Sequence, residues 1–107
     1  VNQGITFRDL ELYSQAVENF DLALRFASIL QRHDRQHPSH LLEGHIYAER
    51  GRTHHLAGDW NCAVADYQHA LTTLPRAASS SQMSHRLLNQ VQCWLNQLLQ
   101  PLLTKDL

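Results

Sequence analysis

The sequence has few of the residues that interrupt regular structure. Its 107 residues include only four glycines and three prolines, which argues against an all-β fold with many tight turns. No apolar run approaches the roughly 18 residues of a membrane span. The formal net charge is -1, so the chain has no basic field to attract nucleic acid or an anionic membrane. We therefore expect no nucleic-acid or membrane partner.

Cysteine is scarce as well. Cys62 and Cys93 are the only two, which is too few to define a disulfide scaffold. Both lie in apolar helical patterns, where a free cysteine behaves as a small hydrophobic residue, although a disulfide between them stays open. We expect a reducing, cytoplasmic environment. Because the chain begins with Val1 and shows no signal-peptide pattern, we also expect it to be part of a larger intracellular protein.

The residues that are abundant favour helices. Apolar residues make up 43% of the chain and charged residues 18%, so an ordered domain is expected. Leucine, alanine and glutamine dominate, and these residues lose little rotamer freedom in a helix. The composition predicts an all-α domain.

An internal repeat organises the chain. A shift of 47 residues, from Gly4 to Gly51, superimposes positions of the same kind, while the polar positions between them disagree. The other matching pairs are Tyr13 with Trp60, Ala16 with Ala63, Val17 with Val64, Phe20 with Tyr67, Ala23 with Ala70, and Leu24 with Leu71. Two copies of one packing unit would show this pattern.

Each copy is predicted to be a helix pair, which gives about five helices in one domain over 1–107. The expected helices span 2–9, 12–35, 41–56, 60–74 and 82–100. Repeat one covers 1–36 and is truncated at its start, 37–40 is a linker, repeat two covers 41–76, and the last helix caps the stack. Asp59 is a good N-cap for the fourth helix, which Pro75 ends.

Apolar residues at helical spacing predict the faces that the longer helices bury. On the second helix these are Ala16, Phe20, Ala23, Leu24, Ala27 and Leu30. On the fourth they are Cys62, Ala63, Val64, Tyr67, Ala70, Leu71 and Leu74. On the last they are Met83, Leu87, Val91, Trp94, Leu95 and Leu98.

The second copy carries Tyr47, Gly51, Trp60 after Gly58-Asp59, Ala63, Tyr67, Ala70 and Pro75. This pattern resembles the tetratricopeptide repeat (TPR) family, and the first copy adds Gly4, Tyr13, Ala16, Phe20 and Ala23. The chain departs from the family at Arg50, His54 and Ser28, where leucine, tyrosine and proline are usual. Its spacing also exceeds the common repeat of about 34 residues. The resemblance implies antiparallel helical hairpins that stack through small and aromatic residues.

In the TPR family the first helix of each repeat lines a concave surface that holds the partner. Carried onto this chain, the groove residues are Ile5, Arg8, His45, Ala48, Arg52 and His55. Arg8 and Arg52 are the candidates for binding a carboxylate, because a guanidinium group pairs with it through two hydrogen bonds. The alternative is that both are solvated charges on a helix surface.

The sequence gives little support for catalysis or metal binding. No phosphate-binding loop, nucleophile elbow or HExxH pattern is present, and Cys62 paired with His69 or His33 is a weak dyad because Cys62 belongs to a packing helix. His33, His37 and His40 could approach a metal ion, but Pro38 lies among them, so exposed linker histidines are favoured. We expect no cofactor, no metal and no enzymatic activity.

The sequence thus predicts a non-catalytic module that holds a protein or peptide segment in a helical groove. The alternative is a self-association or spacer segment, because the apolar stripe of the last helix could pair with a second copy of the chain.

Overall fold

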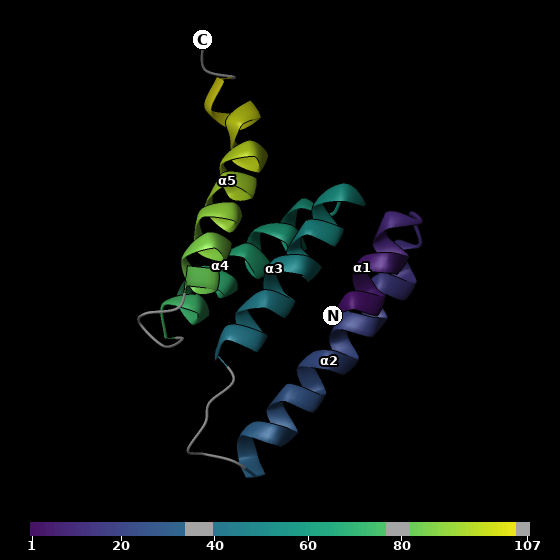
Figure 1. Cartoon of the computed structure of the whole chain (residues 1–107). Coiled ribbons are helices and arrows are strands. Elements are labelled where there is room, and N and C mark those ends of the chain that lie inside the picture. The colour runs from purple at the N-terminus through teal and green to yellow at the C-terminus, as the bar shows by residue number, and fades with distance from the viewer. Residues whose placement is uncertain (34–39, 77–81, 105–107) are drawn as a thin grey trace.

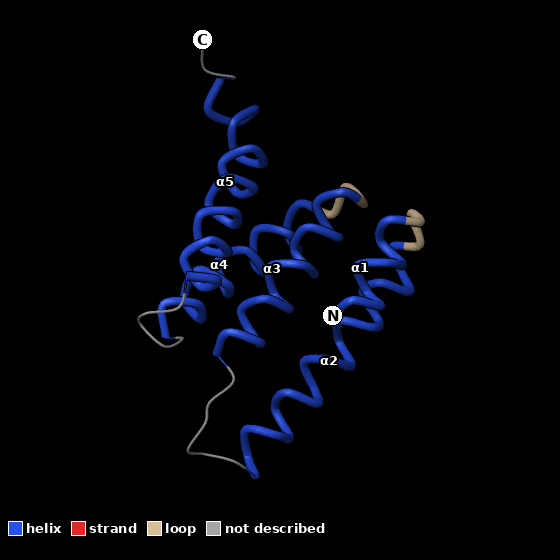
Figure 2. Tube along the Cα trace, in the orientation of Figure 1, coloured by secondary structure: helices blue, strands red, loops and turns tan. Residues whose placement is uncertain are grey.

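The computed structural model describes residues 1–33, 40–76 and 82–104, and the described part is all-α (Figure 2). The α-helices are α1 (Asn2–Asp9), α2 (Tyr13–His33), α3 (His40–Leu56), α4 (Trp60–Thr73) and α5 (Gln82–Thr104), and the 3-10 helix η1 (Leu74–Arg76) follows α4. These bounds confirm the predicted all-α class with five helices. Pro75 lies in η1, directly after α4, and α5 continues about one turn beyond its predicted end. Of the predicted linker 37–40, residues 37–39 lie outside the described residues, and His40 is instead the first residue of α3.

Successive helices alternate in direction, and each packs against the next along the chain (Figure 1). The connection of α1 to α2 and that of α3 to α4 are too short for any arrangement except antiparallel neighbours. α3 lies centrally and contacts α2, α4 and α5. Its position explains why small residues recur on it, since three helices approach its backbone.

Among the described residues, two apolar clusters form the core, and α3 contributes to both. One joins α1, α2 and α3 through Ala16, Phe20 and Ile46. The other joins α3, α4, η1 and α5 through Ala48, Ala63, Tyr67, Ala70, Leu74, Val91, Leu95 and Leu98. α5 therefore covers the apolar face of α4.

The two hairpins pack in the same way at the matching positions. A Cβ atom added to Gly4 would lie 2.7 Å from the Phe20 ring, and one added to Gly51 would lie 2.8 Å from the Tyr67 ring. Both separations are far below van der Waals contact, so any larger residue would force the aromatic ring to shift. The 47-residue repeat thus corresponds to one glycine–aromatic contact made twice.

The turns inside the two hairpins also match. Gly58 has a positive φ of 84°, and Glu11, at the equivalent position of the first copy, has a φ of 61°. In both turns this residue's N–H bonds the carbonyl three residues earlier, and the next N–H bonds the carbonyl five residues before it. These two bonds define a Schellman C-cap. A non-glycine residue here is strained, because left-handed backbone brings its Cβ close to the carbonyl oxygen.

Several predicted core residues are not buried. Cys62 and Cys93 are both exposed free cysteines, which contradicts their expected place in the core. Cys62 is the third residue of α4 and is not among the buried residues of that helix, which include Ala63 and Tyr67. Leu30, which was expected inside, is 57% exposed on α2, and Met83 is 59% exposed on α5.

None of the described helices combines the length and the apolar character that crossing a bilayer requires.

Candidate functional site

Arg50 on α3 forms ion pairs with residues of α2 and α4. Its guanidinium group donates two hydrogen bonds of 2.8 Å to the two carboxylate oxygens of Asp66 on α4 and a third, of 2.7 Å, to Asp21 on α2. It also lies over the Tyr47 ring, 5.5 Å from the centroid. The hydrogen bonds to Asp66 raise the pKa of Arg50 above its ordinary value, so the group stays charged. This network links the second hairpin to the first.

A second charged group lies between α1 and α3. Arg8 donates to the carboxylate of Glu49, and His45 lies 3.6 Å from the other oxygen of that carboxylate. Burial alone would raise the pKa of Glu49, but hydrogen bonds from His45 and Arg8 outweigh it and hold the pKa below its usual value. Arg8 is therefore engaged within the fold, with only 13% of its side chain exposed.

Arg52 and His55 lie near the aromatic residues that join α3 to α4 and α5. The Arg52 guanidinium lies over the Trp94 ring, 5.2 Å from its centroid. Burial, followed by the nearby charge of Arg52, lowers the pKa of His55 and so favours its neutral form. Burial raises the pKa of Tyr67 to about 12, so its hydroxyl keeps a proton and can donate to His55 Nδ1, 3.2 Å away.

A cleft of about 280 Å³ opens between α3 and α5. It is lined by His45, Met83, Arg86, Leu87 and Gln90. Met83 and Leu87 make its surface largely apolar, and Arg86 places an exposed cation beside them. This combination can hold an apolar side chain next to a carboxylate.

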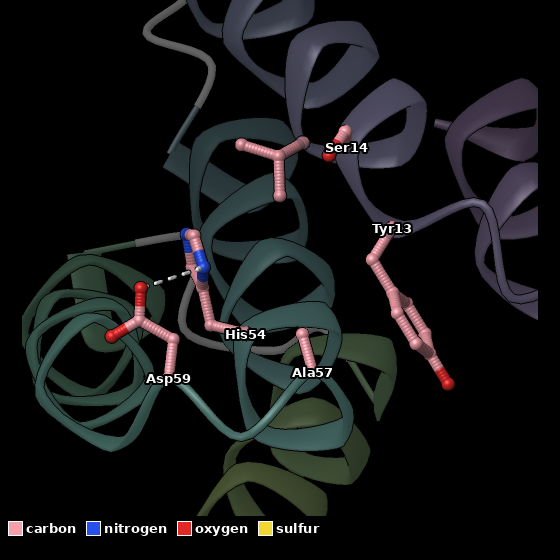
Figure 3. Close-up of a pocket in the computed structure, with 6 residues that line it drawn as sticks. Tyr13, Ser14, His54, Ala57 and Asp59 are labelled. Carbon is pink, nitrogen blue, oxygen red and sulfur yellow. Dashed lines mark ion pairs between the residues drawn. The ribbon is translucent and has the colours of Figure 1, made fainter.

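A broader, more open cleft of about 490 Å³ lies beside the turn between α3 and α4. It is lined by Tyr13, Ser14 and Val17 of α2 and by His54, Ala57 and Asp59. Figure 3 shows the His54 imidazole and the Asp59 carboxylate turned toward each other, with Ser14 and Tyr13 across the cleft. His54 Nδ1 lies 3.8 Å from Asp59 Oδ2.

The structure separates the predicted groove residues into three kinds. Ala48 is completely buried in the core between α3 and α5, so it cannot contact a partner. Arg8 is paired with Glu49, as described above. The remaining four, Ile5, His45, Arg52 and His55, are partly exposed. Of these, only His45 lines the cleft between α3 and α5.

Cys62 does not have the environment of a nucleophile. The hydrogen bond to Asp59 raises the pKa of the Cys62 thiol, whereas reactive cysteines have a lowered pKa. His69, its imagined partner, instead stacks on Tyr47 with the ring centroids 4.1 Å apart. Of the linker histidines considered for metal, His37 and the side chain of His33 lie outside the described residues.

Three residues that matter here were absent from the predicted site: Arg50, Asp66 and Arg86. Asp66 could have been noticed, because it interrupts the inward stripe of α4 between Ala63 and Tyr67. A carboxylate at such a position indicates a buried partner of opposite charge. Arg86 carries no comparable signal, since its place in a cleft depends on how α5 docks.

Comparison with known proteins adds no relative. No family model matches the chain, and neither the curated proteins nor the solved structures yielded a match. The TPR resemblance therefore stays a prediction.

Proposed function

We propose that this chain is a TPR-like interaction module that binds a protein or peptide segment in the cleft between α3 and α5. The observation that carries the proposal is the composition of that cleft, where apolar Met83 and Leu87 lie beside the exposed cation Arg86. A preformed concave site with a few polar groups is typical of ligand recognition. Catalytic machinery forms no part of the proposal.

The chemistry of the cleft selects the partner. An apolar side chain fits against Met83 and Leu87, and an acidic residue one or two positions away in an extended segment reaches Arg86. Arg8 does not serve as the carboxylate clamp, because Glu49 already neutralises it. Arg52 lies over the Trp94 ring and extends the basic surface along α3.

The equivalent packing of the two hairpins supports the TPR part of the proposal. A glycine–aromatic contact, a buried alanine and a Schellman turn recur at the same spacing in both copies. Repeated hairpins form rigid surfaces that recognise partners through side chains that vary between copies. The free, exposed thiols of Cys62 and Cys93 fit a reducing compartment, so an intracellular, cytoplasmic location belongs to the proposal.

Selection of peptides from a random display library on the immobilised chain, followed by fluorescence anisotropy, tests the proposal. We expect selected peptides to combine an acidic residue with an apolar one, and Arg86→Glu to weaken them about 10- to 100-fold, since hydrogen bonds to charged groups contribute about 1.5–3 kcal/mol. Arg25→Glu makes the same charge change at an exposed position of α2 and serves as the matched control. Equal peptide affinities of the wild type and Arg86→Glu would refute the proposal that the partner binds in this cleft.

A second candidate function, self-association, has one observation in its favour. Leu22, Phe26, Ile29 and Leu30 are all exposed on α2 at helical spacing, so they form a single apolar stripe. The stripe of α5 is less suited to pairing, because Val91, Leu95 and Leu98 are buried within the chain's own core. Light scattering over a dilution series tests this: a dimer that Phe26→Glu dissociates would support it, and a monomer at every concentration would exclude it.

A further inference from the structure

We infer that His54, Asp59 and Cys62 form a binding site for a divalent transition-metal ion, with Zn²⁺ as the natural occupant. Their ligand atoms lie within 4.8 Å of one another, at the turn between α3 and α4. The inference is independent of the proposed partner cleft, which lies between α3 and α5. It assigns a site to residues that the interaction function does not use.

The backbone holds these three residues together before any metal arrives. Asp59 donates its N–H to the carbonyl of His54 at 2.8 Å, within the Schellman turn. Asp59 is also the N-cap of α4, and its Oδ1 accepts from the N–H of Cys62 at 3.5 Å. Because Cys62 is the third residue of the helix, its side chain turns back toward the cap, as in a capping box.

The distances suit zinc. Zinc bonds of about 2.0–2.3 Å place neighbouring ligand atoms of a tetrahedral site about 3.3–3.6 Å apart. His54 Nδ1 and Asp59 Oδ2 are already 3.8 Å apart, so they need to close by only a few tenths of an ångström. The side chain of Asp59 is 51% exposed and Cys62 is exposed, so rotamer changes can bring the thiolate into range.

The charge and type of the donors also fit. An imidazole nitrogen, a carboxylate oxygen and a thiolate sulfur are the three ligand types that Zn²⁺ takes in proteins, and they leave a fourth position open to water. Binding releases the thiol proton of Cys62, so one thiolate and one carboxylate neutralise the ion. Calcium and magnesium, which prefer oxygen ligands, are disfavoured.

A buried carboxylate lies near the other ring nitrogen of the histidine. His54 Nε2 is 3.8 Å from Asp66 Oδ2, whereas Asp59 lies near Nδ1. Asp66 is buried and is held by the two hydrogen bonds from Arg50. A metal-bound histidine usually donates its other N–H to a carboxylate, and Asp66 would take this role once the two atoms close by about 1 Å.

Co²⁺ titration of the reduced, chelator-treated full chain tests the inference, because cobalt bound to a thiolate gives a charge-transfer band in the near ultraviolet. We expect this band to saturate at one equivalent and to disappear when Zn²⁺ is added. Cys62→Ser should abolish it, whereas the matched control Cys93→Ser should leave it unchanged. Asp59→Asn keeps a good N-cap and removes the charged ligand, so it should weaken Co²⁺ binding about tenfold or more.

Thermal unfolding gives an independent measurement. Zn²⁺ should raise the melting temperature of the wild type but not that of Cys62→Ser. His40→Gln is the control for the histidine-rich segment, and Zn²⁺ should raise its melting temperature as in the wild type. The inference is overturned if the helical wild type shows no cobalt–thiolate band. A band that survives in Cys62→Ser but is lost in Cys93→Ser or His40→Gln would overturn it equally.

Discussion

Replacing Arg50 by leucine, the residue usual at this place in the TPR family, tests how far a buried ion network holds the two hairpins together. The substitution leaves the Asp66 carboxylate, whose side chain is only 7% exposed, without its two hydrogen bonds from the guanidinium group. It also removes the link to Asp21 on α2. We expect the chain to lose stability, although leucine is the more apolar residue.

The magnitude follows from the burial of the partners. Removing one member of a buried ion pair costs about 3–5 kcal/mol, because the remaining charge stays desolvated. The Arg50 side chain is 22% exposed and Asp21 is 39% exposed, so water compensates in part and the lower end applies. We expect a loss of about 3 kcal/mol in the free energy of unfolding. That loss lowers the melting temperature by about 12–24 °C.

Urea denaturation followed by circular dichroism at 222 nm, a helix wavelength, measures the loss. Asp21→Ala is the matched control: it breaks only the exposed arm of the network and should cost about 0.2–1 kcal/mol. The double variant Arg50→Leu, Asp66→Leu removes both charges and should recover much of the stability. If Arg50→Leu costs less than about 1 kcal/mol, or if the double variant loses the sum of the two single losses, the reasoning is refuted.

Three further predictions concern the turns, the acid response and the helix contact. Both turn positions have a left-handed backbone, which favours glycine. Glu11→Gly should therefore raise the free energy of unfolding by about 1 kcal/mol, and Gly58→Ala should lower it by about the same amount. Urea midpoints that stay at the wild-type value in both variants would contradict this. Because the pKa of Glu49 is lowered in the folded state, this carboxylate stabilises the fold at pH values above its ordinary pKa of 4.5. That stabilisation is lost as the pH falls through the lower folded-state pKa. Wild type should therefore lose its advantage over Glu49→Gln on acidification below about 4.5, and a pH-independent difference between their urea midpoints would count against the ion pair. Gly51→Ala should cost about 1–2 kcal/mol despite better helix propensity, because its Cβ would meet the Tyr67 ring at 2.8 Å; a stability gain would show that the ring moves aside.

Much of the fold follows from the sequence because helices carry local signals. The stops at Gly58 and Pro75 and the cap at Asp59 depend on a few neighbouring residues, and the helix bounds agree closely with prediction. The match of Gly4 with Gly51 and of Phe20 with Tyr67 was equally visible, since both hairpins need the same close contact. Glu11 was missed, because a glutamate gives no sign of a left-handed turn.

Only the tertiary structure determines which charged and polar side chains contact one another. Arg8 stood out as a carboxylate binder, yet the docking of α1 beside α3 gives it to Glu49, and the same packing buries Ala48. Cys62 seemed a core residue from its apolar neighbours, but its place at the start of α4 turns it outward toward Asp59. Helical periodicity is a property of adjacent residues and is written in the sequence, whereas an ion pair or a ligand cluster depends on the angle and register between helices, which only the packed core determines.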